Sequence, residues 1–261
     1  MSKIEKHALG AFCWPELVTT DSAGAKAFYS GMFGWAHEDM PIGEDKFYTM
    51  LKLNGLAVGA LYELMEEQRS QGVPPHWMSY VSVESADASA EKAKQLGGAV
   101  LHGPMDVFTA GRMAVVRDPQ GAVISLWQPR EHIGVEVRDE PGSLCWTELA
   151  TTDAAAATEF YTQLFGWGSK VGETGPIRYT EWTLGEKHIG GMMQMTAEHG
   201  DAPPHWMPYF LVADCDASAA KAKQLGGQVK VGPQDITDVR RFAVLQDPQG
   251  AIVAIYQGAL D

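Results

Sequence analysis

Two glutamates stand at matching places in an internal repeat, and their setting suits chemistry. Glu16 and Glu148 each follow a tryptophan by two residues within an apolar run. A β-strand turns alternate side chains to one face, so each glutamate shares the face of its tryptophan, Trp14 or Trp146. Burial beside an indole would raise the pKa of the carboxyl group, which suits a general base or an anchor for a ligand's hydrogen-bond donor. We take both glutamates as candidate catalytic residues.

A structural interpretation of the same glutamates stays open. Each could pair with a cation and hold the edges of a sheet together, since buried carboxylates usually have a charged or hydrogen-bonding partner. The partners that the sequence offers are Arg112 and His76 in the first half, and Arg241 and His205 in the second.

Further side chains at alternate strand positions are expected to face inward with the glutamates. In the first half they are Trp14, Tyr48, Met50, Met78, Tyr80, Met113, Ser125 and Trp127; in the second they are Trp146, Tyr179, Glu181, Met207, Tyr209, Phe242, Ala254 and Tyr256. An apolar concavity with a few polar groups is typical of a small-molecule pocket. The alternative is that the same side chains fill a core.

The elements that would carry these residues occur twice along the chain. Phe12–Trp35 matches Leu144–Trp167, and Asp118-Pro119-Gln120-Gly121 returns as Asp247-Pro248-Gln249-Gly250. The second motif is a turn between two apolar runs, with Pro at position i+1 and Gly at i+3. The repeat predicts a first domain over residues 1–130, a linker over 131–143 and a second domain over 144–261.

Local signals place strands and helices in the same order in each half. In the first half they predict strands at Phe12–Val18, Phe47–Leu53, Leu56–Glu63, Trp77–Val83, Ala99–His102, Met113–Arg117 and Ala122–Gln128, a helix from Thr20 or Asp21 to Gly34, and a helix at Ala86–Leu96. The capping side chains, the glycines that end the helices and the Asn54-Gly55 hairpin turn are the strongest of these signals.

Composition narrows the class of protein. The 261 residues carry a net charge of −13, which argues against nucleic acid and anionic membranes as partners. Residues 1–10 have no apolar signal core, and Cys13, Cys145 and Cys215 form no CxxC pair. We expect a cytoplasmic protein whose cysteines are buried.

The motif FY-x-x-x-F-G-W at Phe28–Trp35 and Phe160–Trp167, joined to the DPQG turn, resembles the vicinal oxygen chelate superfamily. That superfamily contains glyoxalase I, bleomycin-resistance proteins and extradiol dioxygenases. The resemblance implies an α+β fold of two tandem domains, each a half-open eight-stranded barrel of two βαβββ modules. It also implies that the two domains pair within the chain as a pseudo-dimer and that the concave side of each barrel holds metal and ligand.

The metal positions implied by the resemblance fall on unsuitable residues. They map to Trp14, Ala60, Met78 and Ser125 in the first half, and to Trp146, Gly191, Met207 and Ala254 in the second. None is an ordinary ligand for a divalent ion that takes nitrogen and oxygen donors. A displaced pair remains as an alternative, Glu16 with His76 and Glu148 with His205, which share a strand face.

Three functions remain open. The leading hypothesis is a protein that binds a small organic molecule in a barrel cleft without metal or other cofactor. The second is a metal-dependent lyase or dioxygenase that uses the displaced Glu and His ligands. The third is a protein whose clefts are filled and which acts through its surface.

Overall fold

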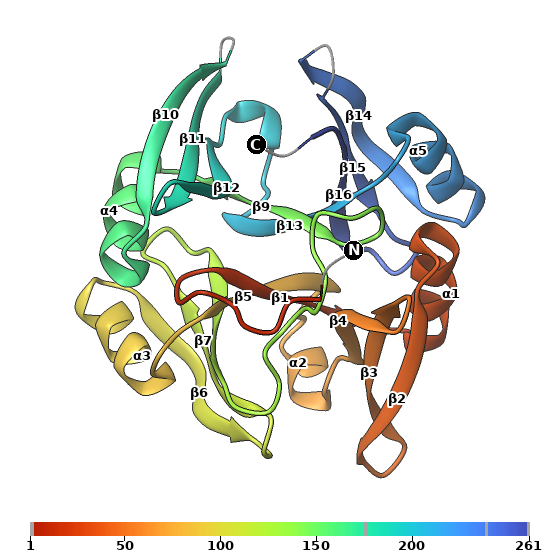
Figure 1. Ribbon diagram of the computed structural model, residues 1–261, viewed down its shortest axis with the longest axis horizontal. Helices are drawn as coiled ribbons and strands as arrows, with labels where there is room; N and C mark the ends of the chain where they lie inside the picture. The colour runs from red at the N-terminus through yellow and green to blue at the C-terminus, as the bar shows by residue number, and fades with distance from the viewer. Residues whose placement is uncertain (1–2, 175–176, 238–239, 260–261) are drawn as a thin grey trace.

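Each half of the chain forms its own eight-stranded sheet, and the two sheets lie back to back (Figure 1). The computed structural model describes residues 3–174, 177–237 and 240–259. The sheet order is β2-β3-β4-β1-β5-β8-β7-β6 in the first half and β10-β11-β12-β9-β13-β16-β15-β14 in the second. Both sheets curve without closing, so the predicted pair of half-open, glyoxalase-like barrels is confirmed.

The elements follow one another in the same sequence in both halves. The first half contains β1 (Phe12–Thr19), α1 (Ser22–Phe33), β2 (Ala36–Gly43), β3 (Lys46–Leu53), β4 (Leu56–Glu63), α2 (Glu66–Ser70), β5 (His76–Ser82), α3 (Ala86–Gln95), β6 (Ala99–Val107), β7 (Gly111–Arg117) and β8 (Val123–Pro129). The second contains β9 (Leu144–Thr151), α4 (Ala154–Phe165), β10 (Gly168–Thr174), β11 (Ile177–Leu184), β12 (Lys187–Gln194), η1 (Ala197–His199), β13 (His205–Leu211), α5 (Cys215–Gln224), β14 (Gln228–Thr237), β15 (Arg240–Gln246) and β16 (Ile252–Gln257). No helix of the described residues is both long enough and apolar enough to span a membrane.

Local sequence signals explain where most of these elements begin and end. The Asp21 carboxylate accepts the Gly24 N–H at 3.0 Å and caps α1, which ends at Gly34 with a φ of 72°. Asn54 and Gly55 take positive φ values in the tight turn between β3 and β4. Edge strands were less visible: β2 was not predicted, and β6 runs beyond the predicted Ala99–His102, because exposed edge residues carry little apolar alternation.

The DPQG turns join β7 to β8 and β15 to β16, and they also connect the two halves. Asp118 Oδ1 accepts the backbone N–H groups of Gln120, Gly121 and Ala122 at 2.7–2.9 Å, which fixes its own turn. Its other oxygen accepts the hydroxyl of Tyr161, on helix α4 of the second half, at 2.9 Å. One buried carboxylate therefore orders a turn and fastens a helix from the opposite half.

The same contact occurs in the other direction. Tyr29, on α1 of the first half, donates its hydroxyl to Asp247 Oδ2 at 3.0 Å and accepts the Trp77 indole N–H at 2.9 Å. Around it, first-half residues such as Phe28 share one apolar core with second-half residues such as Phe210 and Leu245. A matching core joins α4 to the first sheet. The two halves thus pack together within one chain, each helix face completing the core of its neighbour.

We predict that Tyr29→Phe destabilises the fold through this contact. The change leaves Asp247 Oδ2 and the Trp77 indole N–H each without its partner in a buried site, although Asp247 Oδ1 keeps the three N–H groups of its turn. An unsatisfied buried polar group costs about 1–3 kcal/mol. Urea unfolding measures the loss, with Tyr62→Phe as the control because the Tyr62 hydroxyl accepts a long hydrogen bond of 3.3 Å from the Gln68 side chain. Equal destabilisation by the two variants would contradict the structural role of Tyr29.

The shared cores also predict how separate halves behave. Residues 1–140 and 141–261, expressed apart, each expose a helix face that the intact chain buries. We expect neither fragment to unfold cooperatively alone, and we expect an equimolar mixture to form a one-to-one complex by light scattering with a restored thermal transition. If both fragments are monomeric, unfold cooperatively alone and form no complex when mixed, the two halves fold independently.

Candidate functional site

Strand alternation places the two glutamates on the concave faces of the sheets, beside the predicted tryptophans. In the first sheet Glu16 lies between Ala60 on β4 and Met78 on β5, while Trp14 lies opposite Tyr80. In the second sheet Glu148 lies between Gly191 and Met207, with Trp146 opposite Tyr209. The central strands of each sheet therefore bring a carboxyl group and aromatic rings together at the bottom of a curved surface.

Tyrosine hydroxyls hold the Glu16 carboxylate on both sides. Tyr48 donates to Oε2 at 2.6 Å, and Tyr80 donates to Oε1 at 2.8 Å. The Trp14 indole N–H in turn donates to the Tyr48 oxygen at 3.1 Å. Glu16 is 6% exposed, so this chain of hydrogen bonds supplies the partners that water would otherwise provide.

The second half repeats the arrangement. Tyr179 and Tyr209 each donate to one oxygen of Glu148 at 2.8 Å, and the Trp146 indole N–H donates to the Tyr179 oxygen at 2.9 Å. A carboxylate offers about four lone pairs, of which two are used in each half. Each glutamate thus keeps acceptor capacity that a bound donor could use.

Burial controls the protonation of these networks. Loss of solvation raises the pKa of Glu16 and of Glu148 above the ordinary value, and hydrogen bonds from the tyrosines oppose that rise. Burial, together with the neighbouring carboxylate, also raises the pKa of Tyr48, Tyr80 and Tyr209, so their hydroxyls stay protonated and donate. The predicted increase in the glutamate pKa is confirmed in direction and in cause.

The ion-pair interpretation of the glutamates is wrong. The Arg112 guanidinium bonds Asp87 and Asp106, and the Arg241 guanidinium bonds Asp216 and Asp235 in the same way. The rings of His76 and His205 bond the carbonyl groups of Pro74 and Pro203 through Nδ1 at 2.8 Å. Tyrosine hydroxyls, not these arginines and histidines, bond both buried carboxyl groups, and the charge of His199 also acts to lower the pKa of Glu148.

The remaining predicted lining residues gather around the two networks. In the first half Trp14, Tyr80 and Trp127 are buried, and Tyr48, Met50, Met78 and Met113 pack partly buried beside them. In the second half Met207, Tyr209, Ala254 and Tyr256 are buried, with Trp146 and Phe242 partly buried. Much of each concave face is therefore covered by its own side chains, and a binding role for these residues stays a prediction.

A contact between a glutamate and a histidine distinguishes the second concave face. His188 Nδ1 lies 2.5 Å from Glu181 Oε2, and both side chains are partly exposed. The register pairs Glu181 with Gly191 on β12, beside Glu148. The first half carries Met50 at the place of Glu181 and Ala57 at the place of His188. The sequence predicted Glu181 as a lining residue, but nothing in the local pattern singled out His188.

The linker contributes a ring that sequence reasoning missed. The imidazole of His132 packs edge-on against Trp14, with ring centroids 4.5 Å apart, and its backbone carbonyl accepts the Trp127 indole N–H at 2.9 Å. His132 Nε2 is buried and has no hydrogen-bond partner among the described groups. The linker is thus part of the wall of the first concave face.

The residues present do not fit the metal site that the fold implies. The positions for metal ligands hold an indole, a methyl group, a thioether and a serine hydroxyl in the first half. Within the described ranges, no three His, Cys, Asp or Glu side chains gather as a metal site would require. The displaced pair Glu16 and His76, like Glu148 and His205, lacks further ligands of that kind, so we derive no chemistry through a metal.

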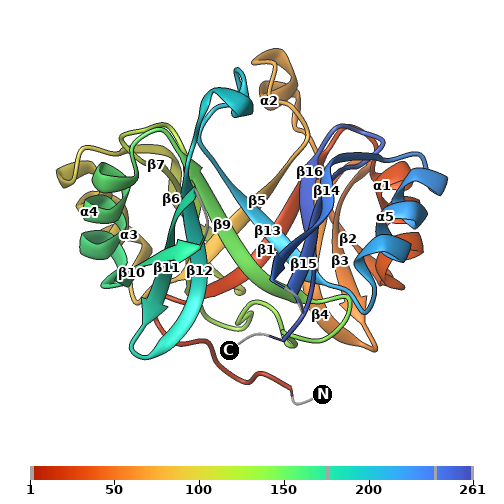
Figure 2. The same cartoon turned by 90° about the horizontal axis from the view of Figure 1, so that it is seen from above.

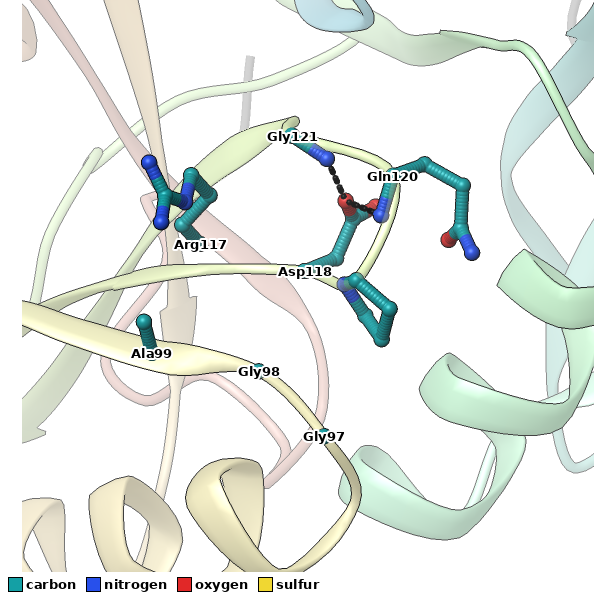
Figure 3. A pocket seen from close by; sticks show the side chains of 8 residues that line it. Gly97, Gly98, Ala99, Arg117, Asp118, Gln120 and Gly121 are labelled. Carbon is teal, nitrogen blue, oxygen red and sulfur yellow. Dashed lines mark hydrogen bonds between the residues drawn. The ribbon is translucent and has the colours of Figure 1, made fainter.

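A surface pocket lies away from the concave faces, at the first DPQG turn (Figure 3). Gly97, Gly98 and the turn Asp118–Gly121 line it. The Asp118 carboxylate accepts the backbone N–H groups of Gln120 and Gly121 in its own turn, and Arg117 also lines the pocket. The pocket belongs to the contact between the halves.

Comparison with known proteins identifies the superfamily to which these paired half-open barrels belong. The model of the Glyoxalase/Bleomycin resistance protein/Dioxygenase superfamily matches residues 8–126 and again 132–255, so the chain belongs to that superfamily. It is 40% identical to the protein named "Putative glyoxylase CFP32" of Mycobacterium tuberculosis, over 99% of both chains. It is 34% identical to the anthracycline biosynthesis protein DnrV of Streptomyces peucetius, over 94% of this chain and 92% of that one.

Solved structures show the same fold at low sequence identity. The Mn(II)-bound glyoxalase from Novosphingobium aromaticivorans superposes with a TM-score of 0.67 at 15% identity, covering 97% of this chain and 83% of that one. The 2,3-dioxygenase LapB from Pseudomonas sp. KL28 superposes with a TM-score of 0.66 at 12% identity, covering 98% and 95%.

The raised glutamate pKa predicts a dependence of stability on pH. Between the unfolded value of 4.5 and the higher folded value, the native protein binds protons more tightly than the unfolded chain, so a rise in pH favours unfolding. Relative to the Glu16→Gln/Glu148→Gln double variant, wild-type stability should fall as pH rises above 4.5, by at most about 1.4 kcal/mol per pH unit for each carboxyl.

Urea unfolding from about pH 4 to about pH 8 measures this difference. The control is Glu159→Gln on the exposed face of α4, whose difference from wild type should not follow the same trend. If the difference in unfolding free energy between wild type and the double variant stays constant with pH, the pKa of the glutamates is not raised in the folded protein.

Proposed function

We propose that the protein binds a planar, largely apolar organic molecule carrying a hydrogen-bond donor, in a concave cleft and without the metal ion of its superfamily. The indole of the Trp-Tyr-Glu network supplies a flat surface for stacking. The glutamate accepts the donor of the ligand, and a hydrogen bond to a charged acceptor is stronger than one between neutral groups. Glu16 and Glu148 remain the candidates for a proton-transfer role if the bound molecule is also transformed.

One observation carries this proposal. Both concave faces keep a buried carboxyl group, held by two tyrosines and backed by an indole, although burial of that carboxyl disfavours its charged form. An apolar side chain at these places would pack without that cost. A ligand that donates a hydrogen bond to the remaining lone pairs of the carboxylate would explain why a carboxyl group stands at these buried places.

The relatives support a planar ligand. The relatives named for anthracycline biosynthesis match at 34% identity over most of this chain, and anthracyclines are built on a flat fused-ring system. Trp14 and Trp146 stand at positions that the resemblance assigns to metal-binding side chains, so each concave face has an indole ring there. The lyase or dioxygenase function would require a set of metal ligands that the described residues do not provide.

Binding of 1,4-dihydroxyanthraquinone tests the proposal. We expect the dye to quench tryptophan fluorescence and to raise the melting temperature of the wild type, since a ligand of the native state stabilises it by mass action. The Trp14→Ala/Trp146→Ala double variant should lose both effects. Removing both carboxylates with Glu16→Gln/Glu148→Gln should weaken binding by about 1.5–3 kcal/mol.

The control for the carboxylate variant is Glu159→Gln, which removes an exposed negative charge from α4. Equal affinity in the wild type and the double tryptophan variant would exclude the concave faces as the site. Metal analysis after purification in the presence of Ni, Zn, Fe and Mn salts checks the proposal that the protein works without a metal ion. A stoichiometric ion that disappears in Glu16→Gln or His76→Ala would overturn it.

A further inference from the structure

We infer that the two concave faces have different tasks: the linker closes the first, and the second, around Trp146 and Glu148, takes the planar ligand. This inference rests on the proposed function for the identity of the ligand. The closure of the first face stands on its own contacts and has its own test.

The linker is bound to the first half by hydrogen bonds of the kind that join strands. The N–H of Val135 donates to the carbonyl of Cys13 on β1, and the N–H of Glu136 donates to the carbonyl of Ala57 on β4, both at 2.8 Å. The Glu136 carboxylate accepts the Ala57 N–H at 2.9 Å. The linker therefore lies across the ends of two neighbouring strands of the first sheet.

The N-terminal segment fixes the linker from the other side. His7 is buried and its Nε2 lies 2.9 Å from the Val135 carbonyl oxygen, and the Ile4 N–H donates to the Glu136 carbonyl. Figure 2 shows the linker and the N-terminal segment together at one end of the paired sheets. Val135 has no exposed surface. These contacts make the closure part of the fold.

The closed end covers the indole on which a ligand would stack. Trp14 is 4% exposed, with the His132 ring against it and Val135 in the same apolar cluster. Trp146, its counterpart, is partly exposed, and no ring of the described residues packs against it.

The two concave faces also differ in the polar groups that their strands carry. In the first half Ser82 and Ser125 bury hydroxyl groups that have no partner among the described residues. The second half has Leu211 and Ala254 at these places, which carry no hydroxyl group; Leu211 is partly exposed and Ala254 is fully buried. The second face adds the partly exposed pair Glu181 and His188 near Glu148. An apolar wall with two acids fits a flat ring system that carries hydroxyl or amine donors.

Acrylamide quenching of tryptophan fluorescence tests the closure without any ligand. Eight tryptophans contribute, so single replacements identify each one. We expect Trp146→Phe to remove a large part of the quenchable fluorescence and Trp14→Phe to remove little. His132→Ala should increase quenching in the Trp146→Phe background, since it exposes Trp14; circular dichroism checks that this variant is folded. Equal quenching losses in Trp14→Phe and Trp146→Phe would overturn the closure.

Titration with 1,4-dihydroxyanthraquinone tests the assignment of the ligand. We expect one dye per chain and a loss of affinity of at least about tenfold in Glu148→Gln, with a smaller change in Glu16→Gln. Two dyes per chain, or a larger loss in Glu16→Gln, would overturn the assignment. A wild type that binds no dye would count against the proposed function, and the quenching experiment would still decide whether the first face is closed.

Discussion

The hydroxyl of each FY-motif tyrosine donates to the aspartate of the DPQG turn in the opposite half, and the rest of the structure depends on this exchange. Asp118 and Asp247 each use one oxygen for three backbone N–H groups and the other for Tyr161 or Tyr29. A buried carboxylate without those partners would be costly. The fold therefore couples the turn of one sheet to the helix of the other, and each half completes a core that it shares with its neighbour.

This coupling determines where the chemistry can lie. Because the helices and the convex sides of both sheets are used for packing between the halves, the concave sides remain for other tasks and open in opposite directions (Figure 1). Each concave side carries its own Glu-Tyr-Tyr-Trp network, so the internal repeat extends to these hydrogen bonds. The linker then breaks the symmetry, since Val135 and Glu136 bond Cys13 and Ala57 of the first sheet, whereas Gly142 and Ser143 bond Leu211 of the second sheet, just before β9 begins.

Local patterns predicted what local forces determine. The caps at Asp21 and Gly34 and the turn at Asn54-Gly55 follow from short-range hydrogen bonds and backbone preference, and strand alternation placed Glu16 beside Trp14. The core shared by Tyr29 and Asp247 was not predicted, because contacts between residues 218 positions apart leave no periodic trace in either segment.

A register shift in β1 and the path of the linker account for the other differences between the sequence-based predictions and the structure. The register shifts between Phe12 and Trp14, so Phe12 packs against Trp167 and Trp206 of the second half although it lies two residues before Trp14. The pairing of Glu181 with His188 and the position of His132 depend on which strands become neighbours and on the path of a linker. The sequence indicated a linker there, but not that its residues would cover a face of the first sheet.

The central claim is that a flat ligand stacks on an indole beside a buried glutamate, and a crystal structure of the protein soaked with 1,4-dihydroxyanthraquinone tests it most directly. We predict that the dye lies against Trp146, with a hydroxyl within hydrogen-bond distance of Glu148, and that the space beside Trp14 stays occupied by His132 of the linker. A dye found only at the Asp118–Gly121 pocket, or a second concave face whose own side chains leave the dye no room, would contradict the account.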